Sequence, residues 1–256
     1  MATVDAVELE SKVKQMYRLV AEQPHDKYHF EMGRPLAERL GYPAELLEKI
    51  PAEAIESFAG VGYFLDLADL RPGERVLDLG SGSGTDSFAA AHLVGPAGAV
   101  LGVDFTAEQL AKARRVAAAA GRSQVEFREG RIDSLPAIDD SSVDCVISNG
   151  VINLSPYKEQ VFAEAARALR PGGRLAIADI LTVVPLTDGI VGNADLWASC
   201  IGGAAQQDTY REAIEKAGLR IEQTRENPYE FISEQARNAS ATYGVHSVSL
   251  LAVKAP

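Results

Sequence analysis

The stretch that decides the fold is Arg75-Val-Leu-Asp-Leu-Gly-Ser-Gly-Ser-Gly-Thr85. The apolar run Arg75–Leu79 leads into three glycines at alternate positions, and apolar residues resume at helical spacing from Phe88 to Val94, within a helix expected over Asp86–Val94. This order predicts a β-strand, a tight turn and a helix. A second apolar run, Ala99–Val103, leads into Asp104 and places a carboxylate at the carboxyl end of the next strand. In a doubly wound sheet, a carboxylate there binds the ribose hydroxyls of a nucleoside-containing cofactor.

The spacing of the glycines indicates which kind of cofactor the turn accepts. Gly80, Gly82 and Gly84 form a Gly-x-Gly-x-Gly pattern, whereas a dinucleotide-binding turn has the pattern Gly-x-Gly-x-x-Gly. Asp78 stands just before the turn, and a carboxylate there suits a cationic ligand better than a diphosphate. We therefore expect a cationic nucleoside cofactor without phosphate, and the spacing argues against a nicotinamide oxidoreductase.

The stretch Val76-Leu-Asp-Leu-Gly-Ser-Gly-Ser-Gly84 resembles the first motif of class I S-adenosylmethionine-dependent methyltransferases. The resemblance implies S-adenosylmethionine as the cofactor, which has an ammonium, a sulfonium and a ribose but no phosphate. The residues that this resemblance implies as cofactor contacts are Tyr17, Asp78, Gly80, Ser81, Gly82, Gly84, Asp104, Phe105, Gln109, Arg131, Ile132, Asp133, Asn149 and Gly150.

The apolar pattern along the chain predicts three regions. Residues 1–70 show helical periodicity without a convincing strand, which indicates a helical cap. Residues 71–183 alternate apolar strands with helices, as is typical of a parallel sheet covered on both faces. Residues 184–256 hold two further strands that suit an antiparallel pair closing the sheet. The predicted fold is α/β, doubly wound and Rossmann-like, with the seven strands Arg75–Leu79, Ala99–Val103, Val125–Glu129, Val143–Ser148, Arg174–Ile180, Arg220–Arg225 and Val245–Val253.

The composition fits one soluble enzyme. The 256 residues are 46% hydrophobic, enough for a substantial core. A net charge of −11 argues against nucleic-acid or anionic-membrane partners, because both select for basic patches. The sequence has no long uncharged apolar span, no secretory signal and only two cysteines, Cys145 and Cys200. We expect a cytoplasmic protein whose partner is a small-molecule methyl acceptor, and the sequence leaves the oligomeric state open.

Segments after the third and fourth strands are expected to complete the cofactor site. Asp133 follows the third strand, where it would accept a hydrogen bond from the adenine amino group while Ile132 packs on the base. Asn149 ends the fourth strand near the expected position of the sulfonium. Its backbone carbonyl or its amide side chain is predicted to orient the cofactor.

Two stretches, Ser148-Asn-Gly-Val-Ile-Asn-Leu154 and Leu196-Trp-Ala-Ser-Cys-Ile-Gly-Gly-Ala204, resemble the arsenite methyltransferase branch. Enzymes of that branch hold trivalent arsenic with cysteine thiolates, one in the N-terminal region and one in each of these stretches. This chain has Gly150 in the first stretch and no cysteine before Cys145, so only Cys200 matches. One thiolate cannot enclose a soft metalloid as two or three can. The resemblance therefore implies the scaffold of this branch with a different or relaxed acceptor.

Methyl transfer depends mainly on aligning the nucleophile, the methyl carbon and the sulfur. A general base is needed only when the acceptor has a proton to lose, and His29 in the cap is the candidate base. Cys200 is the candidate reactive thiol, and Tyr28, Asn153 and Trp197 are candidate walls of the acceptor pocket. No spacing typical of a metal site is present, so no metal is expected.

The predicted function is S-adenosylmethionine-dependent methylation of a small molecule. One alternative is an arsenite methyltransferase that uses Cys200 together with an external thiol. The other alternative is a module that binds S-adenosylmethionine without catalysis.

Overall fold

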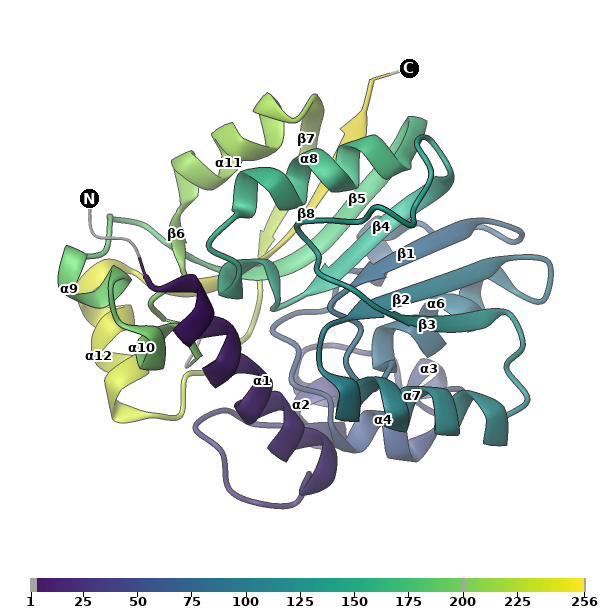
Figure 1. The fold of residues 1–256 in the computed structure, drawn as a ribbon, viewed down its shortest axis with the longest axis horizontal. Helices are drawn as coiled ribbons and strands as arrows, with labels where there is room; N and C mark the ends of the chain where they lie inside the picture. Colours follow the sequence, from purple (N-terminus) through teal and green to yellow (C-terminus); the bar gives the residue numbers. More distant parts are fainter. Residues whose placement is uncertain (1–3, 199–200, 256) are drawn as a thin grey trace.

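The structure is a computed structural model that describes residues 4–198 and 201–255. Its centre is a mostly parallel sheet with the strand order β3-β2-β1-β4-β5-β8-β7, and a short β6 pairs with β5 (Figure 1). Among these described strands, β8 alone runs in the direction opposite to the others, and it is antiparallel to both β5 and β7. The strands are β1 (Arg75–Leu79), β2 (Ala99–Asp104), β3 (Val125–Glu129), β4 (Val143–Asn149), β5 (Leu169–Thr182), β6 (Ala205–Gln206), β7 (Leu219–Glu226) and β8 (His246–Lys254).

The predicted doubly wound, mostly parallel sheet is confirmed, and all seven predicted strands are present. Two details differ from the prediction. The fifth strand starts at Leu169 rather than Arg174, because residues 170–173 bulge out while the strand keeps pairing with β4 on either side. The two-residue strand β6 was not predicted, since so short an extended segment leaves no apolar pattern.

Alternate residues of each strand face two different cores. In β1, Val76 packs into the core beneath α6 and α7, whereas Leu77 and Leu79 pack into the core beneath α8 and α11. Burying one such side chain stabilises the fold by about 1.5–3 kcal/mol. The helices that cover the two faces are α6 (Thr85–Val94), α7 (Ala107–Ala119), α8 (Lys158–Ala168) and α11 (Gln207–Lys216).

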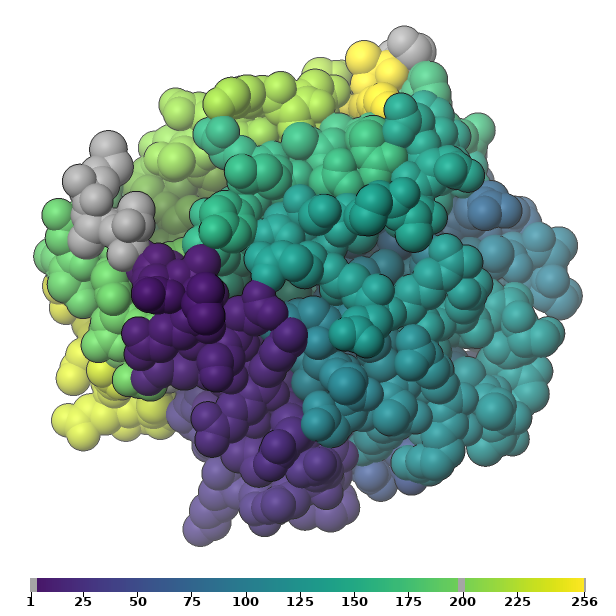
Figure 2. Space-filling model, viewed as in Figure 1, coloured from purple at the N-terminus to yellow at the C-terminus, as the bar shows by residue number. Residues whose placement is uncertain are grey.

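The cap shares a core with the sheet. Leu36, Leu47 and Phe64 are almost fully buried in the same core as Val76. The first helix, α1, lies along the surface and packs against α7 and α10. In Figure 2, the purple residues of this helix have green residues on one side and teal residues of the core on the other. The cap helices are α1 (Ala6–Glu22), α2 (Gly33–Arg39), α3 (Ala44–Leu47), α4 (Ala52–Glu56) and α5 (Leu65–Ala68).

The remaining helical elements follow β4, β5 and β7 along the chain. They are η1 (Ile152–Leu154), α9 (Asp188–Val191), α10 (Ala194–Ala198) and α12 (Glu234–Tyr243). None of the helices in the described ranges is long and apolar enough to cross a membrane. The division of the chain at residues 70 and 183 stays a prediction.

Candidate cofactor and active site

Three strands end side by side at one edge of the sheet. Up to Leu79, β1 lies in parallel register with β2 on one side and with β4 on the other. The residues at the ends of these strands, Gly80, Asp104 and Asn149, therefore share one edge. In the strand order, β2 and β3 lie on one side of β1, whereas β4 and β5 lie on the other. A doubly wound fold binds its ligand at the strand ends where the order reverses in this way.

A cleft at this edge has two adjoining chambers, which share Val13, Gly80, Phe105, Val151 and Leu154. In the first, which we call the glycine-loop chamber, the predicted cofactor residues are Tyr17, Asp78, Gly80, Ser81, Gly82, Asp104, Phe105, Gln109 and Asn149. In the second, which we call the Ile132 chamber, they are Gly80, Phe105, Arg131, Ile132 and Asp133.

The glycine turn serves packing and ligand access at different positions. Gly80 has a φ of +74°, and a Cβ there would lie 2.4 Å from a methyl group of Val151. Gly82 also has a positive φ, +52°, but its nearest neighbour would be Gln109 at 3.7 Å. Gly82 therefore leaves open the side that a ligand approaches. The predicted contacts Gly84 and Gly150 are not among the lining residues, since a Cβ would meet Phe127 at the first and Val61 at the second.

Asp104 holds the glycine turn in place. Its Oδ2 accepts a hydrogen bond from the backbone N–H of Gly82 at 2.9 Å, and its Oδ1 accepts one from Thr106 at 2.8 Å. Only 7% of Asp104 is exposed, and burial raises the pKa of its carboxyl group. The acidic residue that the sequence pairs with the glycine turn is thus in direct contact with it.

Two further carboxylates line the glycine-loop chamber. Asp78 accepts a 2.6 Å hydrogen bond from Ser87, while burial and the nearby Asp86 raise the pKa of Asp78 to about 8. Asp86 accepts hydrogen bonds from the Tyr42 hydroxyl at 2.5 Å and from Asn149 Nδ2 at 3.0 Å. Burial raises the pKa of Asp86 to about 6.

The chamber is therefore suited to a cation. Asp78, Asp86 and Asp104 all line it, and no Lys, Arg or His is among its described lining residues. Charged groups in a buried setting require a partner of opposite charge. The hydroxyl of Ser81 also lines the chamber, and it is a buried polar atom without a hydrogen-bond partner in the structure. Buried hydroxyls usually have such a partner, so Ser81 fits a polar ligand.

The side chain of Asn149 is occupied by the protein itself. Its Oδ1 accepts a hydrogen bond from the backbone N–H of Val61 at 2.8 Å, and its Nδ2 donates to Gly62 O at 3.0 Å. These bonds fix the cap loop whose neighbouring residues Phe58 and Ala59 line the chamber. Either the backbone carbonyl or the side-chain amide of Asn149 was predicted to orient the cofactor. The side-chain amide is used in these bonds, whereas the backbone carbonyl is not.

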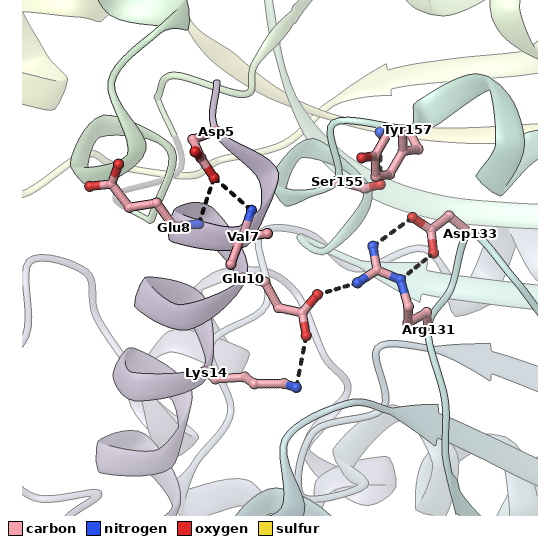
Figure 3. Close-up of polar contacts among 9 residues, drawn as sticks. All are labelled: Asp5, Val7, Glu8, Glu10, Lys14, Arg131, Asp133, Ser155 and Tyr157. Atoms are coloured by element: carbon pink, nitrogen blue, oxygen red, sulfur yellow. Dashed lines mark hydrogen bonds and ion pairs between the residues drawn. The ribbon is translucent and has the colours of Figure 1, made fainter. Parts of the chain in front are cut away.

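Helix α1 is tied to the Ile132 chamber by a chain of charges, shown in Figure 3. Arg131 donates two hydrogen bonds of 3.0 Å to the carboxylate of Asp133. The same guanidinium pairs with Glu10 of α1, which also accepts a 2.8 Å bond from Lys14. The carboxylate predicted to bind adenine is therefore already paired, and Ile132 is one of several apolar residues that line this chamber.

A second connection joins α1 to the glycine turn. Gln109 Nε2 donates a 2.8 Å hydrogen bond to the backbone carbonyl of Tyr17, and its Oε1 accepts one from Ser83 at 2.5 Å. Gln109 is 2% exposed. Gln109 lines the chamber, as predicted for a cofactor contact. Its hydrogen bonds also join α1 to the glycine turn, which the sequence did not indicate.

The predicted acceptor residues lie apart from the cleft lining. The Tyr28 hydroxyl donates a 2.9 Å hydrogen bond to the backbone carbonyl of Gln23, and His29 packs edge-on against Phe30. Trp197 donates from Nε1 to Val191 O at 2.7 Å. These residues and the buried Asn153 are absent from the lining of both chambers. Cys200 lies outside the described residues.

Sequence reasoning missed part of the site. Asp86 stands two residues after the last glycine, and that position at the start of a helix was the only available signal. Phe58 and Ala59 line the chamber because the cap folds back onto the sheet, and no motif marks them. In the described part of the chain, no group of three or more potential ligands is arranged to hold a metal ion.

The parallel sheet with its final antiparallel pair, the glycine turn and the acid after β2 together define a class I methyltransferase. The comparison with known families agrees, since residues 70–218 match the methyltransferase domain family. The chain therefore belongs to the S-adenosylmethionine-dependent methyltransferases.

Within this family the chain is similar to arsenite methyltransferases. One from Halobacterium salinarum is 42% identical over 200 residues, which cover 77% of this chain and 51% of that protein. A solved arsenic(III) S-adenosylmethionine methyltransferase from Chlamydomonas reinhardtii superposes with a TM-score of 0.66 at 32% identity, covering 88% of this chain and 75% of that one.

The chain also resembles enzymes with other printed activities. Nocamycin O-methyltransferase from Saccharothrix syringae is 38% identical over 127 residues, which cover 49% of this chain and 45% of that protein. The chain spans about half the length of curated relatives such as these.

Proposed function

We propose that this chain catalyses methyl transfer from S-adenosylmethionine to a small-molecule acceptor. The observation that carries the proposal is the glycine-loop chamber, whose lining combines Asp78, Asp86 and Asp104 with no basic side chain among its described residues. A chamber of this charge favours a ligand with an ammonium and a sulfonium over an anionic dinucleotide. When bound, S-adenosylmethionine supplies a methyl group already activated by its sulfonium.

The residues of the cleft have separate roles in holding such a ligand. Asp104 faces the ribose hydroxyls, Asp78 faces the ammonium, and Ile132 supplies an apolar surface for the base. These roles are supported by the lining of the two chambers, since Asp78 and Asp104 line the glycine-loop chamber and Ile132 lines the Ile132 chamber. If Asp133 accepts a hydrogen bond from the adenine amino group, its carboxylate binds that group and Arg131 at the same time.

The acceptor meets apolar walls. Phe58 and Ala59 of the cap and Val151 and Leu154 after β4 line the same chamber as the carboxylates. Such walls exclude water and align the acceptor with the methyl carbon, which is most of what this reaction requires. The chamber disfavours an anionic acceptor, because an anion would meet three carboxylates.

The thiol chemistry of a metalloid acceptor has little support among the described residues. Cys145 is fully buried in β4, and burial raises the pKa of its thiol to about 12. A thiol with so high a pKa supplies almost no thiolate near neutral pH. The second candidate, arsenite methylation by Cys200 with an external thiol, rests on the printed activities of similar proteins.

Methyl transfer assays distinguish these functions. The purified chain with labelled S-adenosylmethionine would be offered arsenite with glutathione, and separately a panel of uncharged phenols, alcohols and amines. Methylation of an organic acceptor supports the first proposal. Arsenite methylation lost in Cys200→Ser and kept in the matched Cys145→Ser variant supports the second. Tight cofactor binding without turnover on any acceptor would indicate a non-catalytic module.

A further inference from the structure

Asp86 is held from both sides inside the cleft. It stands in the first turn of α6, is 7% exposed and lines the glycine-loop chamber. Tyr42 from the cap donates to one carboxylate oxygen at 2.5 Å, and Asn149 from the end of β4 donates to the other at 3.0 Å. Two donors from distant parts of the chain thus fix one acidic side chain.

The two donors are themselves immobilised. The ring of Tyr42 packs edge-on against Phe58 at 5.2 Å and against Tyr63 at 4.8 Å between ring centres. Asn149 is anchored by its hydrogen bond from Val61. Asp86 therefore has a preformed orientation toward the chamber, and a ligand need not reorganise it.

The hydrogen bonds to Asp86 come from neutral groups. Its hydrogen-bond partners are a hydroxyl and an amide, and the nearby carboxylate of Asp78 repels its charge. No cationic side chain is among the described residues that line the chamber. The ionised form of Asp86 thus lacks a counter-charge that a cationic ligand would supply.

We propose that Asp86 is a specificity-determining residue that favours the cationic methyl donor over its uncharged-sulfur product, with Tyr42 and Asn149 as positioning residues. The inference rests on the proposed function and deepens it. The donor and the product share their adenosine, ammonium and carboxylate groups and differ at the sulfur, which is a sulfonium in the donor and a thioether in the product. After transfer the attraction from Asp86 falls, which favours exchange of product for new donor.

The test compares two ligands on three forms of the full chain. Dissociation constants for S-adenosylmethionine and S-adenosylhomocysteine would be measured by calorimetry for wild type, Asp86→Asn and Asp104→Asn. Asp86→Asn keeps the size and one acceptor oxygen of the side chain. We expect it to weaken donor binding about tenfold and product binding less than about twofold, since only the donor has the sulfonium charge. Asp104→Asn is the matched control and should weaken both ligands by the same factor.

The outcomes separate this inference from the proposed function. An unchanged ratio of the two affinities in Asp86→Asn would overturn the role of Asp86. Failure of wild type to bind either ligand would instead overturn the proposed function. Tyr42→Phe tests the positioning role if Asp86→Asn folds poorly. It should lower the donor-to-product preference while leaving product affinity nearly unchanged, and a preference equal to that of wild type would contradict the role of Tyr42.

Discussion

The backbone N–H of Gly82 donates a 2.9 Å hydrogen bond to Oδ2 of Asp104, which lies 22 positions further along the chain. This bond joins the glycine turn after β1 to the acid at the end of β2. The two features that point to a nucleoside cofactor in the sequence thus form one structural unit, and the carboxylate that orders the glycine turn is the one that we propose for binding the ribose.

Replacing Asp104 by Ala should weaken cofactor binding strongly. The variant loses the ribose acceptor and leaves the N–H groups of Gly82 and Thr106 without their partner. The cost of such losses, about 1–3 kcal/mol, corresponds to roughly a fivefold to 150-fold rise in the dissociation constant. Calorimetric titration with S-adenosylhomocysteine measures it, and circular dichroism checks that the variant folds. Unchanged affinity would show that Asp104 does not bind the ribose.

Affinity for S-adenosylmethionine should rise with pH between about 5 and 8. Asp78 and Asp86 have pKa values raised to about 8 and about 6, so protons occupy them in the free protein at low pH. A cation favours the ionised carboxylates, and these protons must leave when it binds. The other groups that face the pair are Asp104, Tyr42 and Tyr63. Titrations at several pH values would contradict this account if affinity were flat or fell.

The ligand-free protein should become more stable near pH 8 when Asp78 is replaced by Asn. A carboxyl with a raised pKa in the folded state binds more protons folded than unfolded between about pH 4 and 8, so stability falls as pH rises through that range. Asn removes this dependence and still accepts the bond from Ser87. We expect a gain of about 1 kcal/mol near pH 8 that shrinks toward pH 4.

Urea unfolding at the two pH values tests this prediction. The exposed Asp139 supplies a control, because Asp139→Asn removes the same charge without changing a buried site. Equal effects of the two substitutions at pH 8 would argue against a destabilising charge on Asp78. The same Asp78→Asn variant should bind S-adenosylmethionine more weakly. The Asp78 carboxylate would then lower the stability of the free protein and strengthen ligand binding.

Replacing Gln109 by Ala should loosen α1 over the cleft. The variant leaves the carbonyl of Tyr17 and the hydroxyl of Ser83 without the Gln109 amide, at a cost of about 1–3 kcal/mol. Hydrogen exchange should then speed up in α1, while the amides of β1 stay protected. Glu108→Ala, which changes the neighbour of Gln109 in α7, is the control. Equal exchange rates in α1 for both variants would show that Gln109 does not hold the helix.

The sheet could be predicted because its signals are local. Each buried parallel strand is a short apolar run, and the residue after it must lie at the ligand-binding edge. That rule predicted the positions of Asp104 and Asn149 at this edge. Helix α12 was not predicted, because only Ala236 and Ala239 of its side chains are buried and its sequence lacks an apolar stripe.

The surroundings of the predicted acceptor residues could not be read from the sequence, because tertiary contacts determine them. His29, Tyr28 and Trp197 have residue types that suit a pocket, yet their side chains contact neighbouring residues away from the cleft lining. The role of Asp86 depends on Tyr42, 44 positions earlier in the chain. No sequence spacing connects the two, so only the packing of the cap onto the sheet reveals the pair.

The central claim is that the cleft binds S-adenosylmethionine and its product. Calorimetric titration of the purified chain with S-adenosylhomocysteine tests it most directly, with NAD as the anionic control. The account predicts micromolar binding of S-adenosylhomocysteine and no measurable binding of NAD. Binding of NAD with no response to S-adenosylhomocysteine would contradict it.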